Sequence, residues 1–411
     1  MSSSTDDSTR CCIIGAGPGG LMLALLLVRA GVPTTVVEMH QDFDRDFRGD
    51  TIHPSTMEVL HQIGLADRVL SLPHTKAPSF RIMSSGRSRE VAVYRRLPTQ
   101  FPYMTVMPQA QFLQFLADEA GRYPHFRLVM GAAVHGLLEH QGRVIGVSYR
   151  HRTGKSALRA ALTVGADGRF STSRKLCGFE AVSQSEPMEV LWFRVPRKAN
   201  DGEHEWALRQ EDGQIVILLG RVDEWQIGCV MRKGGYQQLK IRGIEALRAS
   251  VGRAVPWLAE RLNAIENWQQ VNVLVVEAQR VLRWHKPGLL LIGDAVHVML
   301  PIAGVGINCA IADAVEAANV LVKPLRAGEV HDRDPARIQR RREWVTRIVQ
   351  GFQAALQRRA LQADADATTF VPPLPIRIIE RLPGVRDLPA RITGFGVRRV
   401  RVQHTKELPV V

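Results

Sequence analysis

The sequence lacks several features that mark whole classes of protein. Its five cysteines are an odd number without a CxxC spacing, which excludes a disulfide framework and a cysteine-based zinc site. The longest apolar run, 21–28, stops at Arg29 and is far shorter than the roughly 20 residues of a membrane-spanning helix. The first ten residues are polar and show no secretory signal. We therefore expect reduced thiols, a cytoplasmic location and no stable membrane insertion.

Neither a metal-ligand spacing nor a nucleic-acid-binding pattern is present. The residues His53, His61 and His297 are scattered, so we predict no metal site. The formal net charge is +14, and residues 331–411 hold 16 Lys and Arg against 8 Asp and Glu. No basic run is interleaved with aromatic residues, and no zinc finger or RNP-type motif occurs. We expect no nucleic acid as partner. The excess charge indicates either a solvated basic C-terminal surface or a surface that attracts anionic substrates, acidic lipids or phosphates.

The N-terminal part has the pattern of a strand, a tight turn, a helix and a second strand. The strand 10–14 leads into the turn 15–20, the apolar helix 21–30 follows, and the strand 33–39 is rich in Thr and Val. This order is the βαβ beginning of a parallel sheet. Beyond it we expect helices over 52–70, 108–120, 243–263, 304–322 and 335–363, strands within 126–166 and at 214–220, 224–231, 271–281 and 288–293, and a proline-rich tail on the surface from 371.

The turn reads GAGPGG and places Gly15, Gly17 and Gly20 in GxGxxG spacing, with Pro18 among them. Glycines allow a tight turn and a close backbone approach to a pyrophosphate, and the helix N-terminus offers free N–H groups. Glu38 ends the second strand, where an acid accepts hydrogen bonds from an adenosine ribose that carries no 2′-phosphate. The pattern therefore predicts that FAD or NAD binds here.

Two later motifs also place polar residues at the ends of strands. The segment GDAVHVMLPIAGVGIN, residues 293–308, brings Asp294 to the carboxyl end of an apolar strand and then starts a helix at Gly304. Its loop can bring backbone N–H groups against an anionic ring system. The segment GADGRFSTSRK, residues 165–175, ends another strand at Asp167. Together the three motifs are much more specific than a lone GxGxxG.

In this order and spacing, the motifs resemble the class A flavoprotein monooxygenases of the p-hydroxybenzoate hydroxylase type, over about residues 10–330. The resemblance implies an enzyme that uses FAD, NAD(P)H and O2 to hydroxylate an aromatic or polycyclic small molecule through a flavin hydroperoxide. It places Pro301 at the oxygen-activation side, whereas Gln109 and Val296 depart from the family's commoner Arg and Ala. Besides Glu38 and the glycine turn, it implies FAD contacts at Arg48, Gln109, Val134, Asp167, Asp294, Gly304, Val305, Gly306, Ile307 and Asn308.

The predicted fold class is α/β. An FAD-binding Rossmann-like domain is interleaved with a mixed or antiparallel-sheet substrate domain, and a helical region follows at the C-terminus. We expect the FAD-binding domain to comprise 10–75, 105–180 and 280–330, the substrate domain 76–104 and 181–279, and the C-terminal helix and basic tail 331–411.

The substrate is expected between the flavin and the second domain, although the sequence identifies no catalytic base. A single Rossmann fingerprint fits transient docking of NADPH or NADH rather than a stable second nucleotide site. The candidates for a base or proton relay are His53, Tyr94, Tyr103 and Tyr236. The candidates for the substrate pocket are Trp192, Arg194, Ile217, Leu219 and Met231.

Two other functions remain open from the sequence. A reductase or saturase of isoprenoid chains shares the FAD fold, and an FAD-binding redox sensor would use the fold without catalysis. Flavin-dependent halogenases also share it, but their WxWxIP signature is absent because Trp257 and Trp268 lie far apart. Substrate-stimulated oxygen consumption separates the hydroxylase from the alternatives.

Overall fold

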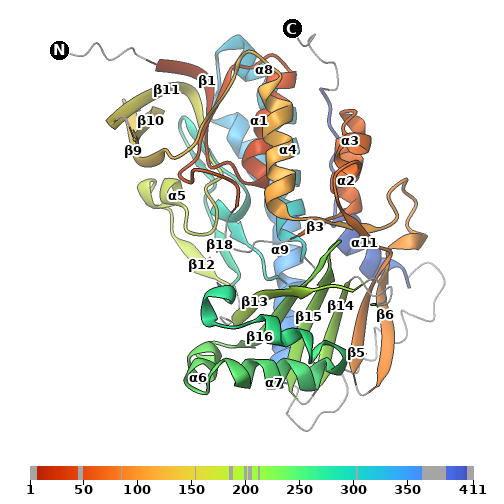
Figure 1. Ribbon diagram of the computed structural model, residues 1–411. Helices are drawn as coiled ribbons and strands as arrows, with labels where there is room; N and C mark the ends of the chain where they lie inside the picture. Colours follow the sequence, from red (N-terminus) through yellow and green to blue (C-terminus); the bar gives the residue numbers. More distant parts are fainter. Residues whose placement is uncertain are drawn as a thin grey trace.

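The structure is a computed structural model that describes residues 7–44, 50–84, 86–152, 154–184, 188–198, 201, 206–211, 213–301, 304–362 and 386–404. Two large sheets dominate this part of the chain, an eight-stranded first sheet and a seven-stranded second sheet. Figure 1 shows them one above the other, with the long helix α9 running behind. This arrangement confirms the predicted α/β class with an interleaved second sheet.

The first sheet is parallel at its centre, as the βαβ pattern predicts. Strand β1 (Asp7–Ile14) pairs in parallel with β2 (Thr34–Val37) on one side and β11 (Gly154–Gly165) on the other. Helix α1 (Pro18–Arg29) is apolar on all sides and almost wholly buried, because α4 (Gln109–Gly121) and α8 (Gly306–Ala327) both pack against it. The sheet is completed by β8 (Phe126–Val129), β9 (Ala133–His140), β10 (Arg143–His151), β19 (His285–Lys286) and β20 (Leu289–Leu291).

The second sheet buries both of its faces. Leu191 and Phe193 belong to the apolar cluster that includes the helices α6 (Gly235–Ile241) and α7 (Ile244–Ala254), whereas Trp192 points to the opposite face. That opposite face is turned toward the first sheet (Figure 1). The strand order is β17 (Asn272–Val276), β13 (Met188–Pro196), β16 (Glu224–Arg232), β15 (Gln214–Gly220), β14 (Trp206–Glu211), β5 (Ser79–Ser84) and β6 (Arg87–Val93).

Two small sheets and several helices connect the layers. One small sheet joins β12 (Ala181–Ser183), β18 (Gln279–Val281) and β21 (His297–Val298), and the other joins β3 (Thr51–Ile52), β7 (Met104–Val106) and β4 (Thr75–Ala77). The connecting helices are α2 (Pro54–Gln62), α3 (Ala66–Leu70), α5 (Thr172–Leu176), α9 (Arg333–Gln362) and α11 (Leu388–Phe395). Short 3-10 turns lie at Tyr94–Arg96, Pro256–Leu258, Arg261–Ala264, Trp268–Gln270 and Gly293–Ala295.

Four predicted elements differ from the structure. The helix expected over 243–263 ends at Ala254, because Pro256 disfavours helix at the residue before it, and two 3-10 turns follow. The single helix expected over 52–70 is broken into α2 and α3, because Gly64 adopts a φ of 73° between them. The strand expected over 271–281 is two strands in different sheets. The helix α11 forms within the expected surface tail, and its Phe395 is buried beside the second sheet. In the described part of the chain, no helix is both long and apolar enough to cross a membrane.

Candidate functional site

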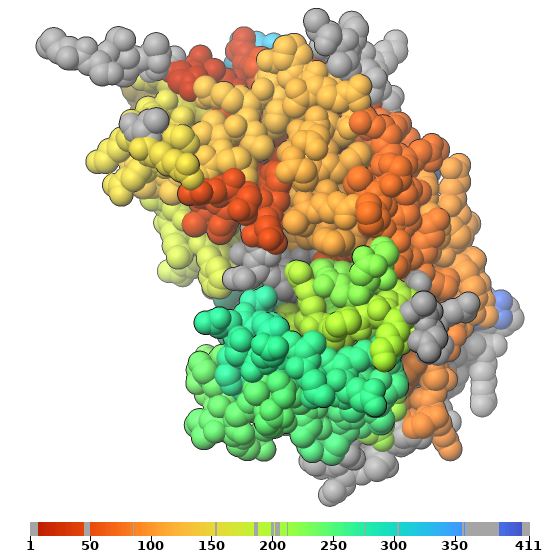
Figure 2. Space-filling model, in the orientation of Figure 1, coloured from red at the N-terminus to blue at the C-terminus, as the bar shows by residue number. Residues whose placement is uncertain are grey.

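A cavity of about 550 Å3 lies between the two large sheets. Figure 2 shows the seam along which the green second layer meets the yellow and orange upper layer. The exposed side chains of Met39 and Phe170 are part of the cavity lining. The cavity receives the carboxyl ends of parallel strands on one side and an apolar sheet face on the other, which is a common place for ligands in α/β folds. Among the sequence-predicted cofactor residues, it is lined by Gly15, Gly17, Pro18, Glu38, Gln109, Val134, Asp167, Asp294, Gly304, Gly306 and Ile307.

The glycines of the first turn have different roles. Gly15 has a φ of 100°, and a Cβ there would lie 2.6 Å from the Ala166 carbonyl oxygen. A Cβ on Gly20 would collide with the carbonyl oxygen of Gly15, so both of these glycines are required by the turn itself. Gly17 has room for a Cβ on the protein side, and it begins α1 without a side-chain cap. The free N–H groups of α1 are thus available to an anionic ligand in the cavity.

Glu38 is buried at the end of β2 and binds two backbone groups. Its Oε2 accepts from the N–H of Ala16 at 2.6 Å, and its Oε1 accepts from the N–H of His40 at 2.9 Å. These contacts fix the carboxylate against the glycine turn. Each carboxylate oxygen has a second lone pair, so the group can still accept hydrogen bonds from a ribose.

Asp167 uses its carboxylate to hold the start of α5. Its Oδ1 accepts from the hydroxyls of Ser171 and Ser173, both at 2.6 Å, and its Oδ2 accepts from the N–H of Ser173 at 2.8 Å. The motif therefore closes a loop, and the loop lines the cavity from Asp167 to Phe170. Part of what made the motif recognisable is this local hydrogen-bond pattern.

The third motif supplies a second helix N-terminus. Asp294 is half-buried in the 3-10 turn after β20, and α8 begins at Gly306 without a side-chain cap. Gly304 has a φ of 60°, and a Cβ on it would collide with the hydroxyl of Thr51. A Cβ on Gly306 would meet nothing within 4 Å, so this glycine faces open space in the cavity.

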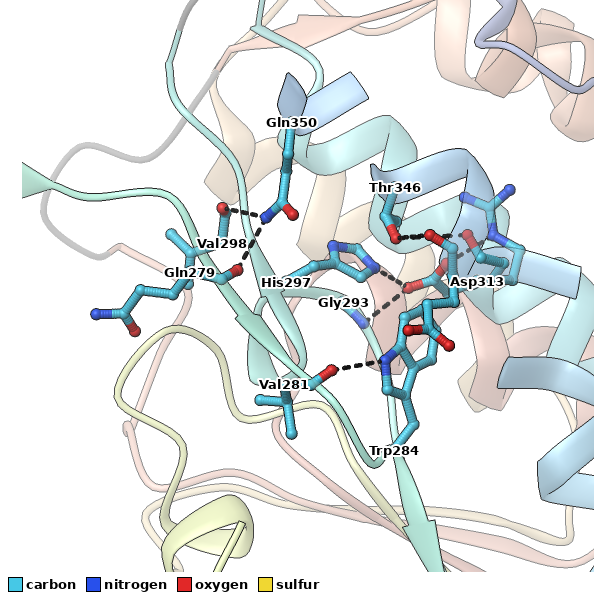
Figure 3. A network of polar contacts seen from close by, with 11 residues as sticks. Gln279, Val281, Trp284, Gly293, His297, Val298, Asp313, Thr346 and Gln350 are labelled. Carbon is cyan, nitrogen blue, oxygen red and sulfur yellow. Dashed lines mark hydrogen bonds and ion pairs between the residues drawn. The ribbon is translucent and has the colours of Figure 1, made fainter. Parts of the chain in front are cut away.

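A buried charge network beneath this turn was not predicted. Asp313 accepts from the N–H of Gly293 at 3.0 Å, from Nε2 of His297 at 2.5 Å and from Nε of Arg342 at 2.7 Å (Figure 3). Burial raises the pKa of Asp313, but the charges of His297 and Arg342 outweigh it and hold the pKa at about 2. The sequence did carry one signal for this network, because Asp313 is an acid on the buried face of α8.

Three of the predicted cofactor residues that the structure describes are absent from the cavity lining. Gly20 lies beneath the turn, and Val305 is buried on the other side of the α8 start. The side chain of Asn308 accepts from the N–H of His53 at 3.0 Å and from the hydroxyl of Thr56 at 2.7 Å. Arg48 lies outside the described residues.

The second sheet contributes an apolar wall. Trp192, Ile217 and Leu219 line the cavity, together with Trp206 and Leu274, which sequence reasoning missed. No sequence pattern pointed to Trp206 and Leu274. Strand alternation shows which side chains of one strand share a face, but it does not show which other strands lie beside that strand.

Two predicted substrate residues are not part of the cavity lining, although the charge of Arg194 acts on Asp50. Arg194 is half-exposed and pairs with Glu224 at 3.6 Å, and Met231 packs under Gly235.

The predicted candidates for a base are held in structural contacts. His53 is buried, donates from Nδ1 to the Thr393 carbonyl at 2.5 Å, and has its pKa lowered by burial to about 4. Tyr94 is buried, with its hydroxyl 2.9 Å from that of Thr393, and burial raises its pKa. Tyr103 lies under the ammonium group of Lys76, and Tyr236 packs edge-on against Trp268.

A different acid does line the cavity. Asp50 is buried and paired with buried Arg221, whose Nε and Nη2 donate to its Oδ2 at 2.9 and 2.5 Å. Burial raises the pKa of Asp50 to about 6, and the opposing charge of Arg221 limits the rise. The two residues are 171 positions apart, so no local pattern could join them.

The residues present fit a large anionic dinucleotide. Two helix N-termini open into one cavity, and Gly306 leaves space where a side chain would stand. The Oε1 atom of Gln109 is buried in the cavity lining and has no hydrogen-bond partner among the described residues, so it can accept from a ligand. No group of three or more metal-ligating side chains occurs in the described ranges.

Comparison with known proteins gives the family. The model of the FAD binding domain family matches residues 8–350. The chain is 31% identical over 398 residues to 6-methylpretetramide 4-monooxygenase from Streptomyces rimosus, covering 96% of this chain and 94% of that protein. It is 24% identical over 333 residues to 3-demethoxyubiquinol 3-hydroxylase from Escherichia coli, covering 79% and 82%.

A solved structure shares the fold. PqsL from P. aeruginosa in complex with 2-aminobenzoylacetate has a TM-score of 0.76 at 22% identity, covering 88% of this chain and 99% of that chain. The prediction of an FAD-dependent monooxygenase is thereby confirmed, and NAD(P)H is the reductant typical of this family. The chain belongs to the family of FAD-dependent aromatic monooxygenases.

Proposed function

We propose that this monooxygenase hydroxylates a planar, polycyclic phenol held between the two sheets. The observation that carries the proposal is one continuous cavity with two different ends. At one end are the N-termini of α1 and α8, neither of which has a side-chain N-cap. At the other end are the side chains of Trp192 and Trp206. Such a cavity suits an anionic cofactor next to a flat apolar substrate. The relative that acts on 6-methylpretetramide supports this substrate class.

The first sheet would hold the two halves of FAD. Gly15, Gly17 and Pro18 would lie along the pyrophosphate, Glu38 would bind the adenosine ribose, and Val134 would contact the adenine side. Asp294 would bind the ribityl chain, and the segment Gly304 to Ile307 would lie along the ring, with Gln109 and Arg48 as further contacts. When bound, FAD supplies the transfer of electrons from NAD(P)H to O2 and the insertion of one oxygen atom.

The protein's own residues set the environment of that chemistry. The N–H groups at the start of α8 stabilise negative charge that develops on a ring placed beside them. The apolar wall of Trp192, Trp206, Leu219 and Leu274 orients a flat substrate and keeps water away from the reacting atoms. Pro301 lies in the same lining, on the loop before α8, at the side assigned to oxygen.

NADPH or NADH docks transiently, in keeping with the single dinucleotide fingerprint, and the net charge of +14 attracts it. The partners of the enzyme are then O2, a nicotinamide nucleotide and a small aromatic molecule, without nucleic acid. We place it in the cytoplasm, where both nucleotides are available.

The test is the anaerobic rate at which NADPH and NADH reduce the bound flavin, measured with and without a panel of phenols and polycyclic aromatics. We expect at least one polycyclic phenol to raise the rate about tenfold or more, because the ligand shifts the population of flavin positions. One unchanged rate across the panel would refute the substrate class. Absence of reduction by either nucleotide would favour a reductase or a sensor fed by another donor.

A further inference from the structure

The ion pair of Asp50 and Arg221 joins the two layers at the cavity wall. Asp50 directly precedes β3, where the hydroxyl of Thr51 donates to the Gly304 carbonyl at 3.3 Å. Arg221 follows β15 of the second sheet. The Asp50 side chain is 2% exposed and that of Arg221 is 6% exposed. The carboxylate is thus next to the start of α8 on one side and the apolar sheet face on the other.

This carboxylate keeps capacity for a ligand. A carboxylate has about four lone-pair sites. Both Arg221 contacts are to Oδ2, and the backbone N–H of Gln109 also faces the group. In the described structure, these contacts leave at least one acceptor site, and Asp50 lines the cavity.

The other acids in the described lining are differently placed. Glu38 binds backbone N–H groups of the glycine turn, and Asp167 binds the start of α5. Asp294 lies in the turn after β20. Asp50 alone among these four is paired with a residue that follows a strand of the apolar wall.

We propose that Asp50 is the catalytic base that takes the proton from the substrate's phenolic hydroxyl, and that Arg221 positions it. The inference rests on the proposed function. The O–H bond of the substrate breaks, its electron pair stays on the substrate oxygen, and a new O–H bond forms on the carboxylate. After oxygenation the ring hydrogen leaves to water as a proton, Asp50 returns its proton to the substrate oxygen, and the carboxylate is restored. NAD(P)H supplies the electrons, as in the established activity.

The surroundings suit this task. A phenolate ring is richer in electrons than a phenol and is attacked more readily by an electrophilic oxygen. Burial raises the pKa of Asp50 to about 6, which strengthens it as a base while it remains ionised at neutral pH. The charged groups that face it are Arg221 and Arg194, and Arg221 is itself paired with Glu224. All three come from the second sheet or its loops.

The test compares Asp50→Asn with Glu90→Gln. Glu90 is an acid of the second sheet that pairs with Arg81 and Arg95 outside the cavity lining, so it is a matched control. The probes are the most stimulating phenol of the panel and its ring-fluorinated analogue, which is more acidic but similar in size. We expect Asp50→Asn to bind FAD normally and to lose about 100-fold or more in hydroxylation of the phenol. At a pH where the analogue is already ionised, the variant should regain most of the lost rate, and Glu90→Gln should match the wild type throughout.

Three results would overturn the inference. Asp50→Asn could hydroxylate the neutral phenol at the wild-type rate, or it could lose activity equally with both probes. If that variant does not fold, the pH profile of hydroxylation by the wild type replaces it. We expect the rate with the neutral phenol to fall as the pH is lowered through about 6, because Asp50 then takes up a proton and can no longer act as a base. A rate that does not fall in this range would contradict the role. Failure of the proposed function is distinct, because the wild type would then show no substrate-stimulated reduction.

Discussion

Replacing Gly306 by alanine should raise the stability of the apoprotein and lower its affinity for FAD. The added Cβ meets no protein atom within 4 Å, and Gly306 is the first residue of α8. Glycine-to-alanine changes at compatible positions stabilise by about 0.4 to 1 kcal/mol, so the apoprotein should become slightly more stable. The same methyl group stands where the flavin ring is proposed to lie. Overpacking of a formed contact costs about 1 to 3 kcal/mol, which weakens FAD binding roughly 5-fold to 150-fold.

The assay is a pair of measurements on apoprotein stripped of flavin. Urea unfolding gives the free energy of unfolding, and quenching of flavin fluorescence gives the dissociation constant of FAD. Gly351→Ala is the matched control, since Gly351 lies within α9, outside the cavity lining, and its Cβ also meets nothing within 4 Å. It should stabilise the protein without changing the affinity. Unchanged FAD affinity in Gly306→Ala, beside a normal gain in stability, would refute the placement of the ring along α8.

Three further predictions use the same measurements or simple extensions of them. Gly228→Ala puts a Cβ 2.7 Å from the ring of Trp192, so it should displace that side chain and abolish substrate stimulation of flavin reduction, while the FAD dissociation constant stays within about twofold. Asp313→Asn leaves buried Arg342 without its partner's charge and should lower the free energy of unfolding at pH 7 by about 3 kcal/mol or more. The pKa of Asp313 is about 2 in the folded protein, below its ordinary value of 3.8. This contribution is therefore present above pH 4 and declines as the pH falls toward 2, so the wild type and variant should converge in acid. The thiol of Cys229 is buried with its pKa raised to about 12, so it should resist a thiol reagent at pH 8 until the protein is unfolded, and fast labelling of the native protein would contradict its burial.

The beginning of the fold was predictable because its causes are local. The turn needs Gly15 and Gly20 for backbone reasons that a sequence displays, and a wholly apolar helix can only be a buried one. The break at Gly64 was missed because the apolar spacing of Met57, Leu60 and Ile63 continues smoothly to the next residues. Apolar periodicity is judged over a window of many residues, so it does not reveal a single residue with a left-handed backbone conformation.

The cavity's second half was less predictable for a different reason. Trp192 and Leu219 were expected on one wall from strand alternation, which also assigned Arg194 to that wall. Alternation continues without a break through Arg194, but that side chain is half-exposed, pairs with Glu224 and is not part of the cavity lining. The pairing of Asp50 with Arg221 spans 171 positions and depends wholly on how the two sheets meet. The sequence therefore predicted the motif residues of the first sheet that line the cavity, but it did not predict the pair of Asp50 and Arg221.

The helix α9, which comes after all of the sequence motifs, binds the chain that lines the cavity before α8. The side chain of Gln350 donates to the carbonyls of Gln279 and Val298 (Figure 3). The side chain of Gln353 accepts from the N–H of Leu300 and donates to the carbonyl of the same residue. The chain that leads to Pro301 is thus held by hydrogen bonds from α9, a helix that begins some thirty residues later at Arg333. A truncation after α8 would retain all three sequence motifs and lose the hydrogen bonds that Gln350 and Gln353 make with the chain before Pro301. The unit that folds around the cavity is therefore longer than its motifs.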